Sequence, residues 1–513
     1  MHWVRASGIL LHPTSLPGRY GIGDLGNAAY DWIDFLATSH QALWQVLPLG
    51  PTGYADSPYA CLSAFAGNPL LISLDKLSEQ GYLAATDLDD LPAFPPHRVD
   101  YGRVIACKVP LLERAARQFL ACASPQQQDA YRQFARRNRH WLDDYALFAA
   151  AKEHHNQSIW YDWDREIALR EPAAVENWRA PGKASDRLAL HKVLQFFFFQ
   201  QWHALKQYAN DRGVRIIGDM PIFVATDSAD VWAHRDLFFL DQLGRPTRVS
   251  GVPPDYFSET GQRWGNPLYR WDVMAQRGFQ WWISRTQAAL QQFDMIRIDH
   301  FRGFAAYWEI PATEPTAVRG RWVPGPGADF FQAIRDRLGD LAIIAEDLGV
   351  ITPEVTDLLQ RFGFPGMKIL QFAFDQDALR ASFDVTSAGW RNPFLPHNYI
   401  PNCVAYTGTH DNETTLGWLR NATPAQRQAA LDYLGCTEPD FVQAMIRSVL
   451  ASVANTAILP LQDILELGNE ARMNHPGTIG SNWTWRVLPN ALTPQLANRL
   501  AKLTDLYERQ VHQ

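Results

Sequence analysis

The sequence predicts an α/β fold, specifically a (β/α)8 TIM barrel with large helical and loop insertions. The first observation is that eight short apolar runs, rich in β-branched residues, each end in a polar or Gly/Pro-containing cluster. Such runs are typical of buried parallel strands. The second observation is that helical patterns lie between most of these runs, and this alternation is typical of a parallel barrel. The eight predicted strands are Gly8–His12, Leu43–Leu49, Arg215–Ile222, Met295–His300, Ala342–Asp347, Met367–Phe372, Cys403–Thr409 and Ala457–Leu461.

The helical patterns fall where a barrel requires them. Ala28–Thr38 lies between the first two predicted strands, Asp329–Leu338 precedes the fifth, and Pro353–Phe362 follows it. Each carries apolar residues at three- and four-residue steps, as a helix packed on one face does.

A long insertion separates the second predicted strand from the third. It takes about 160 residues, whereas the other units take roughly 30 to 45. Val109–Ala121, Gln126–Ala151 and Arg187–Asn210 show helical spacing, and the four consecutive Phe of Phe196–Phe199 are expected to pack between helices. The predicted organisation is therefore residues 1–60 for the first barrel strands, 61–210 for an inserted, mainly helical subdomain, and 211–513 for the rest of the barrel.

A second insertion, at about 244–271, follows the third predicted strand. Gly244–Trp271 is rich in Gly, Pro and aromatic residues. We expect it to lack regular structure and to form a functional loop, because long irregular loops in compact folds usually serve function.

Composition narrows the class of protein. The net charge is -7, from 47 Lys+Arg against 54 Asp+Glu, with no block of like charge, which argues against nucleic acid or an anionic membrane as partner. The five cysteines form no C-x-x-C pair, and the N-terminus has no signal-peptide pattern, so we expect a reduced, cytoplasmic protein. The 19 Trp, 17 Tyr and 27 Phe partly build core, but they also suit a groove that binds the flat faces of sugars.

Reactive side chains gather at the ends of four predicted strands. In the fourth strand, period-two alternation points Arg297 and Asp299 toward the barrel axis. This pair alone could be a structural ion pair. However, Asp219, Glu346 and Asp411 also lie at strand ends, and such a concentration of negative charge would destabilise a purely structural site.

A cluster of carboxylates with an Arg and two His, His300 and His410, suits glycoside transfer. One carboxylate attacks the anomeric carbon, and a second, protonated one gives its proton to the leaving oxygen. A divalent metal is the alternative, because carboxylates and His also bind Mg or Mn. The aromatic insertion favours the carbohydrate interpretation.

Several long motifs resemble one family, the amylomaltases, which are 4-α-glucanotransferases (disproportionating enzymes) distantly related to α-amylases. The motifs include SGILLHPTSLPGRYGIGDLG (7–26), IRIDHFRG (296–303), AEDLG (345–349) and THDNETT (409–415), and the similarity runs in order from about residue 5 to about 490. The resemblance implies a (β/α)8 barrel without a C-terminal β-domain. It also implies a retaining double displacement on α-1,4-linked glucans.

The resemblance further implies a role for each site residue. Asp299 would be the nucleophile, Glu346 the general acid and base, and Asp411 the carboxylate that grips and distorts the sugar. Arg297 would hold Asp299 ionised. The other implied glucan contacts are Asp219, His300, His410, the stacking platform Tyr59, and Ser57 and Asn474. Ala55 stands where the family motif is expected to have Gly.

Transfer to a sugar rather than to water requires a site that excludes water or positions the acceptor better. Tyr256, Phe257 and Trp264 are the predicted cover. The expected partners are maltooligosaccharides, amylose or glycogen-derived glucans, with glucose or a glucan as acceptor and with no cofactor and no metal. An α-amylase-like glucan hydrolase is the alternative function, and a non-catalytic glucan-binding protein is disfavoured because all three carboxylates are present.

Overall fold

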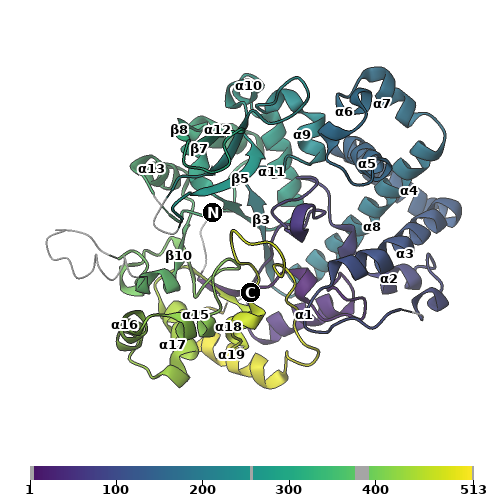
Figure 1. Ribbon diagram of the computed structural model, residues 1–513. Helices are drawn as coiled ribbons and strands as arrows, with labels where there is room; N and C mark the ends of the chain where they lie inside the picture. Colours follow the sequence, from purple (N-terminus) through teal and green to yellow (C-terminus); the bar gives the residue numbers. More distant parts are fainter. Residues whose placement is uncertain (1–4, 90, 255–257, 350, 376–391, 511–513) are drawn as a thin grey trace.

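The computed structural model describes residues 5–89, 91–254, 258–349, 351–375 and 392–510 (Figure 1). Within these ranges no helix is both long enough and apolar enough to cross a membrane.

Eight parallel strands close into a barrel in the order β1-β12-β11-β10-β9-β6-β3-β2. Each predicted strand is confirmed, with small shifts at the ends. The bounds are β1 Ala6–Leu10, β2 Leu43–Gln45, β3 Arg215–Pro221, β6 Met295–Asp299, β9 Ile343–Ala345, β10 Gly366–Ile369, β11 Cys403–Tyr406 and β12 Thr456–Pro460.

The first and last strands close the barrel. Ala6 of β1 pairs with Thr456 of β12, and the register continues to Leu10 and Pro460. Arg509, after the last helix, reinforces this closure because its Nη1 donates to the carbonyl oxygen of Ala6 at 3.1 Å.

Alternation along β6 separates two faces, as predicted. Ile296 and Ile298 pack in the cluster shared with the helices, whereas Met295 belongs to a cluster inside the barrel to which the other barrel strands also contribute, among them Ile217 of β3 and Met367 of β10. Arg297 is on the inner side and is 3% exposed. The pairing of β3 with β6 sets Asp219 beside Arg297.

Helices surround the barrel and form a separate group between β2 and β3. That group lies at the right of Figure 1 and contains α2 (Leu74–Glu79), α3 (Tyr101–Cys122), α4 (Pro125–Arg137), α5 (Arg139–His154), α6 (Arg165–Ala168), α7 (Pro172–Arg179) and α8 (Lys183–Asp211). The pattern read over Gln126–Ala151 is two helices, because the chain leaves helical geometry at Asn138. Phe196–Phe199 are all buried, and Phe196 and Phe199 contact Phe134 of α4, as expected for packing between helices.

Among the remaining helices, α1 (Asn27–Thr38) packs against α8 and α19 (Pro494–Leu506), and α11 (Gln280–Gln292) packs against α8 and α12 (Gly327–Leu338). The others are α9 (Ala229–Ala233), α10 (Trp271–Gln276), α13 (Pro353–Phe362), α15 (Thr415–Asn421), α16 (Pro424–Leu434), α17 (Phe441–Ala451) and α18 (Leu461–Ile464).

The expectation that 244–271 lacks regular structure is wrong. β4 (Arg248–Val252) and β5 (Gln262–Pro267) form a hairpin in a four-stranded antiparallel sheet of order β5-β4-β7-β8, with β7 Ala306–Pro311 and β8 Arg321–Pro324. Gly251 allows the two strands of the hairpin to approach closely, because a Cβ there would lie 2.2 Å from the carbonyl oxygen of Gln262.

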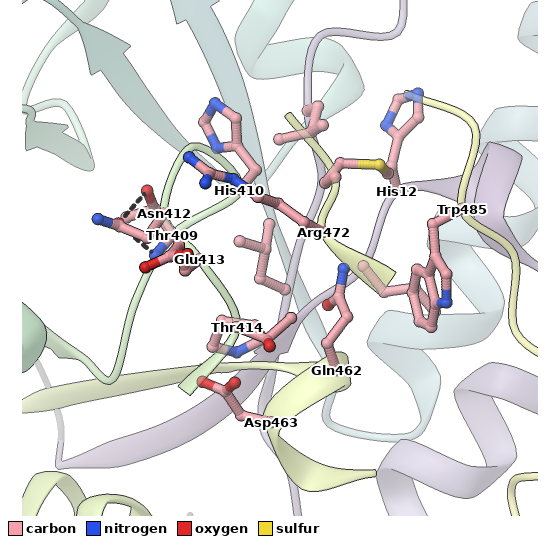
Figure 2. Close-up of a pocket in the computed structure, with 15 residues that line it drawn as sticks. His12, Thr409, His410, Asn412, Glu413, Thr414, Gln462, Asp463, Arg472 and Trp485 are labelled. Carbon is pink, nitrogen blue, oxygen red and sulfur yellow. Dashed lines mark hydrogen bonds between the residues drawn. The ribbon is translucent and has the colours of Figure 1, made fainter. Parts of the chain in front are cut away.

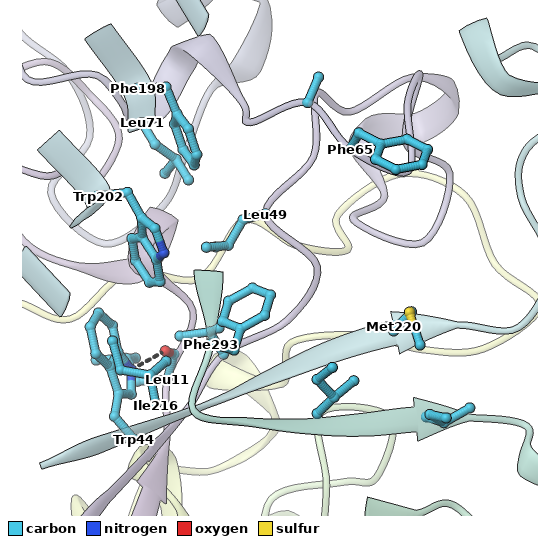
Figure 3. Close-up of a cluster of buried hydrophobic side chains, with 14 of the residues drawn as sticks. Leu11, Trp44, Leu49, Phe65, Leu71, Phe198, Trp202, Ile216, Met220 and Phe293 are labelled. Carbon is cyan, nitrogen blue, oxygen red and sulfur yellow. Dashed lines mark hydrogen bonds between the residues drawn. The ribbon is translucent and has the colours of Figure 1, made fainter. Parts of the chain in front are cut away.

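Most of the tryptophan is core. Trp44, Trp202 and Phe293 lie between barrel strands and helices, where the indole Nε1 of Trp44 donates to the carbonyl oxygen of Leu11 at 2.7 Å (Figure 3). Six Trp are among the largest fully buried side chains. The sugar-binding interpretation of the aromatic content therefore does not apply to these fully buried rings.

Candidate active site

A cleft of about 660 Å³ opens at the carboxyl ends of the barrel strands. It is lined by the three predicted catalytic carboxylates, Asp299, Glu346 and Asp411. The predicted residues Ser57, Tyr59, Arg297, His300, Trp264 and Asn474 also line it. Side chains that are far apart in the sequence thus meet in one place, as expected where parallel strands end together.

Arg297 connects two carboxylates beneath the cleft. Its Nη1 donates to both oxygens of Asp219, at 2.8 and 2.6 Å, and its Nη2 donates to Oδ1 of Asp299 at 2.9 Å. The predicted Arg297–Asp299 contact is present, and Asp219 is a second partner on the opposite side of the guanidinium.

Asp219 lies below the cleft surface. Its side chain is fully buried, and it also accepts a hydrogen bond from the Tyr59 hydroxyl at 2.7 Å. Both oxygens of Asp219 are therefore occupied by Arg297 and Tyr59. Asp219 is not among the residues that line the cleft, and its direct contact with a sugar stays a prediction.

Burial and, after it, the nearby charge of Asp299 raise the pKa of Glu346 to about 8. Two backbone amides oppose this effect. His300 N–H donates to Oε2 at 2.7 Å and Leu348 N–H to Oε1 at 2.8 Å, which fixes the plane of the carboxyl group. Glu346 is therefore predominantly protonated at neutral pH.

The neighbours of Asp299 shift the pKa of its carboxyl group in opposite directions. Burial raises the pKa of its carboxyl group, the charge of Arg297 lowers it, and the charges of Asp219 and Asp411 raise it again. The Asp299 side chain is 29% exposed and faces the cleft. Arg297, which contacts Asp299 directly, stabilises the ionised form of this member of the Asp299–Glu346 pair.

Asp411 is more exposed than Asp299, at 45% of its side chain against 29%. Asn474 Nδ2 donates to Asp411 Oδ1 at 2.7 Å, and the Nε2 atom of His410 lies 3.3 Å from the same oxygen. Arg472 donates to the Asp411 backbone oxygen at 2.7 Å. The predicted residue Asn474 thus orients a predicted catalytic carboxylate.

His410 belongs to a small cavity of about 20 Å³ beneath the cleft (Figure 2). Its ring stacks on Tyr59, with centroids 5.1 Å apart. The loop that carries His410 and Asp411 is anchored by buried Asp463, which accepts hydrogen bonds from Thr407 and Thr415 at 2.6 to 2.7 Å. Asp463 was not predicted, because its nearest chemical partners are distant in sequence.

His300 adopts a left-handed backbone conformation, with φ of 53°. Such a conformation is uncommon for a residue other than Gly and costs roughly 1–3 kcal/mol. Burial lowers the pKa of His300 to about 3, so the ring is neutral, and its buried Nε2 finds no hydrogen-bond partner among the described residues. The ring of Trp264 meets His300 edge-on, at 4.8 Å between centroids.

Ala55 also has a left-handed backbone, with φ of 54°. This geometry explains why a Gly is expected there, since Gly adopts positive φ without steric cost. The adjoining Tyr54 is 73% exposed at the cleft, and the Ser57 hydroxyl accepts a hydrogen bond from Tyr59 N–H at 3.2 Å.

Trp322 and Arg302 line the cleft although neither was singled out from the sequence. The guanidinium carbon of Arg302 lies 3.8 Å from the centroid of the Trp322 ring. Arg302 belongs to the IRIDHFRG motif, which was a usable signal, but Trp322 lies on β8, where no motif marked it.

Tyr256 and Phe257, two of the three predicted cover residues, lie outside the described residues. Their role stays a prediction. Among the described residues, no group of three or more His, Cys, Asp or Glu is arranged to hold a metal ion.

Comparison with known proteins identifies a close set of relatives. Residues 11–492 match the model of a family described as 4-alpha-glucanotransferase. The 4-alpha-glucanotransferase of Thermus thermophilus is 53% identical, covering 99% of this chain and all of that protein, and that of Synechocystis is 50% identical, covering 99% of each. The solved structure of amylomaltase from Streptococcus agalactiae in complex with acarbose is 41% identical with a TM-score of 0.92, covering 99% of this chain and all of the other.

Proposed function

This chain belongs to the 4-alpha-glucanotransferase family, and from that premise we propose that Asp299, Glu346 and Asp411 are its catalytic residues. The chain is an amylomaltase-type transferase that acts on α-1,4-glucans. The observation that carries the proposal is the meeting of these three carboxylates in one cleft, with Arg297 bonded to one of them and paired backbone amides bonded to another.

In the first step, an Asp299 oxygen attacks the anomeric carbon of the donor glucan. The bond from that carbon to the glycosidic oxygen breaks, and its electron pair goes to the leaving oxygen, which takes the proton of Glu346. The reducing-end fragment departs, and a glycosyl ester remains on Asp299. The raised pKa of Glu346 supports the role of acid in this step.

In the second step, the roles reverse. Glu346, now ionised, removes the proton of an acceptor hydroxyl as that oxygen attacks the anomeric carbon. The ester bond breaks, and its electrons return to Asp299 as a carboxylate. Two inversions at the same carbon give overall retention of the α configuration.

The surrounding residues are proposed to position the sugar. Asp411 would accept hydrogen bonds from ring hydroxyls, because its exposed oxygen faces the cleft and Asn474 holds the other oxygen. The unpartnered Nε2 of neutral His300 is a donor for a further hydroxyl. Tyr59 offers its ring as a platform, while Asp219 acts indirectly by fixing Tyr59 and Arg297.

Further proposals concern substrate and location. We propose maltooligosaccharides, amylose or glycogen-derived glucans as donors and glucose or glucans as acceptors. We also propose acarbose as a ligand, because the Streptococcus agalactiae relative was solved in complex with it. The five thiols are unpaired, which supports a reducing, cytoplasmic location.

Incubation with maltotriose, with and without added glucose, tests the reaction. A transferase gives a ladder of longer glucans whose distribution shifts toward shorter products when glucose is added. The α-amylase-like alternative would release reducing ends with a pattern that glucose leaves unchanged.

The same assay tests Asp299. Asp299→Asn keeps the shape of the side chain but not the nucleophile, so turnover should fall by a factor of about a hundred or more with the fold intact by circular dichroism. A folded variant with activity near the wild type would remove Asp299 from this role. A wild-type protein that hydrolyses maltotriose without forming longer products would instead contradict transfer.

A further inference from the structure

A second cavity, of about 250 Å³, shares no residue with the catalytic cleft. It lies between helix α5 of the inserted group, the short helix α9 and the loop and helices α10 and α11 beside the barrel. Its volume is slightly below the range of about 300–1,000 Å³ typical of ligand pockets, so it suits a ligand the size of a single sugar ring.

Aromatic rings form much of its wall. Phe65 stacks on Trp141, with centroids 6.3 Å apart and planes 11° apart, and meets Trp281 edge-on at 6.1 Å. These three residues line the cavity and give it apolar, aromatic walls, the kind of surface against which the C–H groups of a pyranose pack.

Polar groups interrupt the aromatic wall. Asp230 is 5% exposed, and its Oδ2 accepts a hydrogen bond from Ala64 N–H at 2.7 Å. The buried indole Nε1 of Trp281 finds no acceptor among the described residues. Ser63 and Ser284 add hydroxyl groups. Donors and acceptors among apolar faces match a ligand with several hydroxyls.

The charges of the wall are largely compensated within the protein. Arg277 pairs with Asp236 at 2.5 Å, and Asp144 pairs with Arg170 at 2.6 Å. Burial lowers the pKa of His140, which keeps its imidazole neutral at pH 7. A wall whose arginine is already paired gives little attraction for a phosphate or carboxylate, so a neutral ligand fits better.

We propose that this cavity is a second carbohydrate site, which binds a neutral monosaccharide of the glucose type. The sugar ring would pack among Phe65, Trp141 and Trp281, with hydroxyls bonded to Asp230 and to the Trp281 indole. Only the choice of glucose as the probe rests on the proposed function, because glucose is a product and an acceptor of that reaction.

The cavity is connected to the cleft through one segment of chain. Ala64, which donates to Asp230, follows Tyr59 by five residues, and Leu62 between them accepts a hydrogen bond from Ala229 N–H at 2.9 Å. Ser63 and Phe65 of the cavity wall are therefore carried by the same anchored segment as Tyr59, the stacking platform of the cleft.

Hydrogen–deuterium exchange with glucose locates binding without requiring turnover. The experiment uses the full chain and the Asp299→Asn variant, with α17 as an internal reference and sorbitol, which has no ring, as the control solute. We expect glucose to slow exchange in residues 139–146 and 277–285, about twofold when its concentration equals the dissociation constant. Protection in both proteins supports the site even if the catalytic proposal fails.

Two matched variants on α11 complete the test. Ser284→Phe fills the cavity and should abolish the protection, whereas Gln287→Phe adds the same ring at an exposed position of the same helix, outside the cavity wall, and should preserve it. Both variants are checked by thermal unfolding. Absence of glucose protection in the wild type, equal protection by sorbitol, or protection that persists in folded Ser284→Phe would overturn the proposal. Should Ser284→Phe fail to fold, Ala233→Leu fills the same cavity from α9 and carries the same expectation.

Discussion

Glu346 and Asp299 are both half-buried carboxyl groups that line the cleft, yet different neighbours contact them. Asp299 receives a guanidinium hydrogen bond, and Glu346 receives two backbone amides and the repulsion of Asp299. A positive charge stabilises an ionised carboxylate more than neutral amides do, so the pair divides into one charged and one protonated member. That division is what a double displacement requires at its start.

The pH dependence of kcat/KM follows from this pair. Glu346 must be protonated to act as an acid, so the rate should fall as pH rises through about 8. Asp299 must be ionised, so the rate should also fall at acidic pH, with a limb above the ordinary pKa of an aspartate because burial raises the Asp299 pKa. Initial rates on maltotriose across the stable pH range would show the resulting bell.

The variant Glu346→Gln tests whether the fall in rate at alkaline pH is caused by deprotonation of Glu346. The substituted amide nitrogen would face one of the two backbone N–H groups, so the fold of this variant must be checked separately. With α-glucosyl fluoride, whose leaving group needs little protonation, formation of the glycosyl ester in this variant should show no alkaline limb. If the rate for this variant still falls at alkaline pH, a group other than Glu346 must cause that fall.

Strands β3 and β6 are joined by more than their backbone ladder, because Arg297 and Asp219 form a buried ion pair between them. Arg297→Met would leave the Asp219 charge buried without its partner, at a cost of about 3–5 kcal/mol in the free energy of unfolding. Arg297→Met combined with Asp219→Asn removes that charge and should recover most of the loss. Denaturant unfolding measures both.

The double variant also separates stability from catalysis. Because it lacks the cation beside Asp299, its activity should stay low even where its stability returns. A single Arg297→Met variant as stable as the wild type would show that the pair contributes nothing to holding β3 against β6.

The β4–β5 hairpin brings Trp264 over the cleft, 40% exposed and against His300. Removing the ring in Trp264→Ala should let water compete for the intermediate, changing the ratio of hydrolysis to transfer by about 1 kcal/mol, roughly fivefold. Glucose release with and without excess acceptor reports the ratio. Leu243→Ala, an exposed residue outside the cleft, is the matched control, and equal ratios in both variants would exclude a shielding role for Trp264.

The barrel strands could be predicted from the sequence, whereas the antiparallel sheet could not. A strand such as β12 is buried along its whole length, and its sequence TAILP is an almost continuous apolar run. β5 is exposed over its first three residues and both β4 and β5 contain Gly, so neither apolar pattern nor composition distinguishes this hairpin from a loop.

The candidate site, like the fold, could be predicted only in part from the sequence. Strand-end carboxylates were found because parallel strands end together, but spacing cannot tell which of them faces the ligand. Asp219 is the clear example, since its burial depends on Arg297 and Tyr59, which come from other parts of the chain.

Over the protein as a whole, Arg297 pairs with Asp219 and Asp299, and the described residues form no group of three or more His, Cys, Asp or Glu that could hold a metal ion. We therefore predict that exhaustive chelation leaves both maltotriose disproportionation and the unfolding temperature unchanged. If chelation abolishes activity and added Mg²⁺ or Ca²⁺ restores it, the metal interpretation of the carboxylate cluster would be favoured instead.

The pairing of β1 with β12 has a consequence for how the protein is made. On the ribosome, β1 emerges early, while its partner at Thr456–Pro460 is translated only after nearly all the other strands. Until then, one edge of β1 has unpaired amides and carbonyls that can capture strands of other chains. The cleft depends on the same event, since the carboxylates occupy their places only when the ring of strands closes. The nascent chain is therefore prone to aggregation through β1 until β12 has been synthesised. A chain that lacks β12 is expected to be inactive.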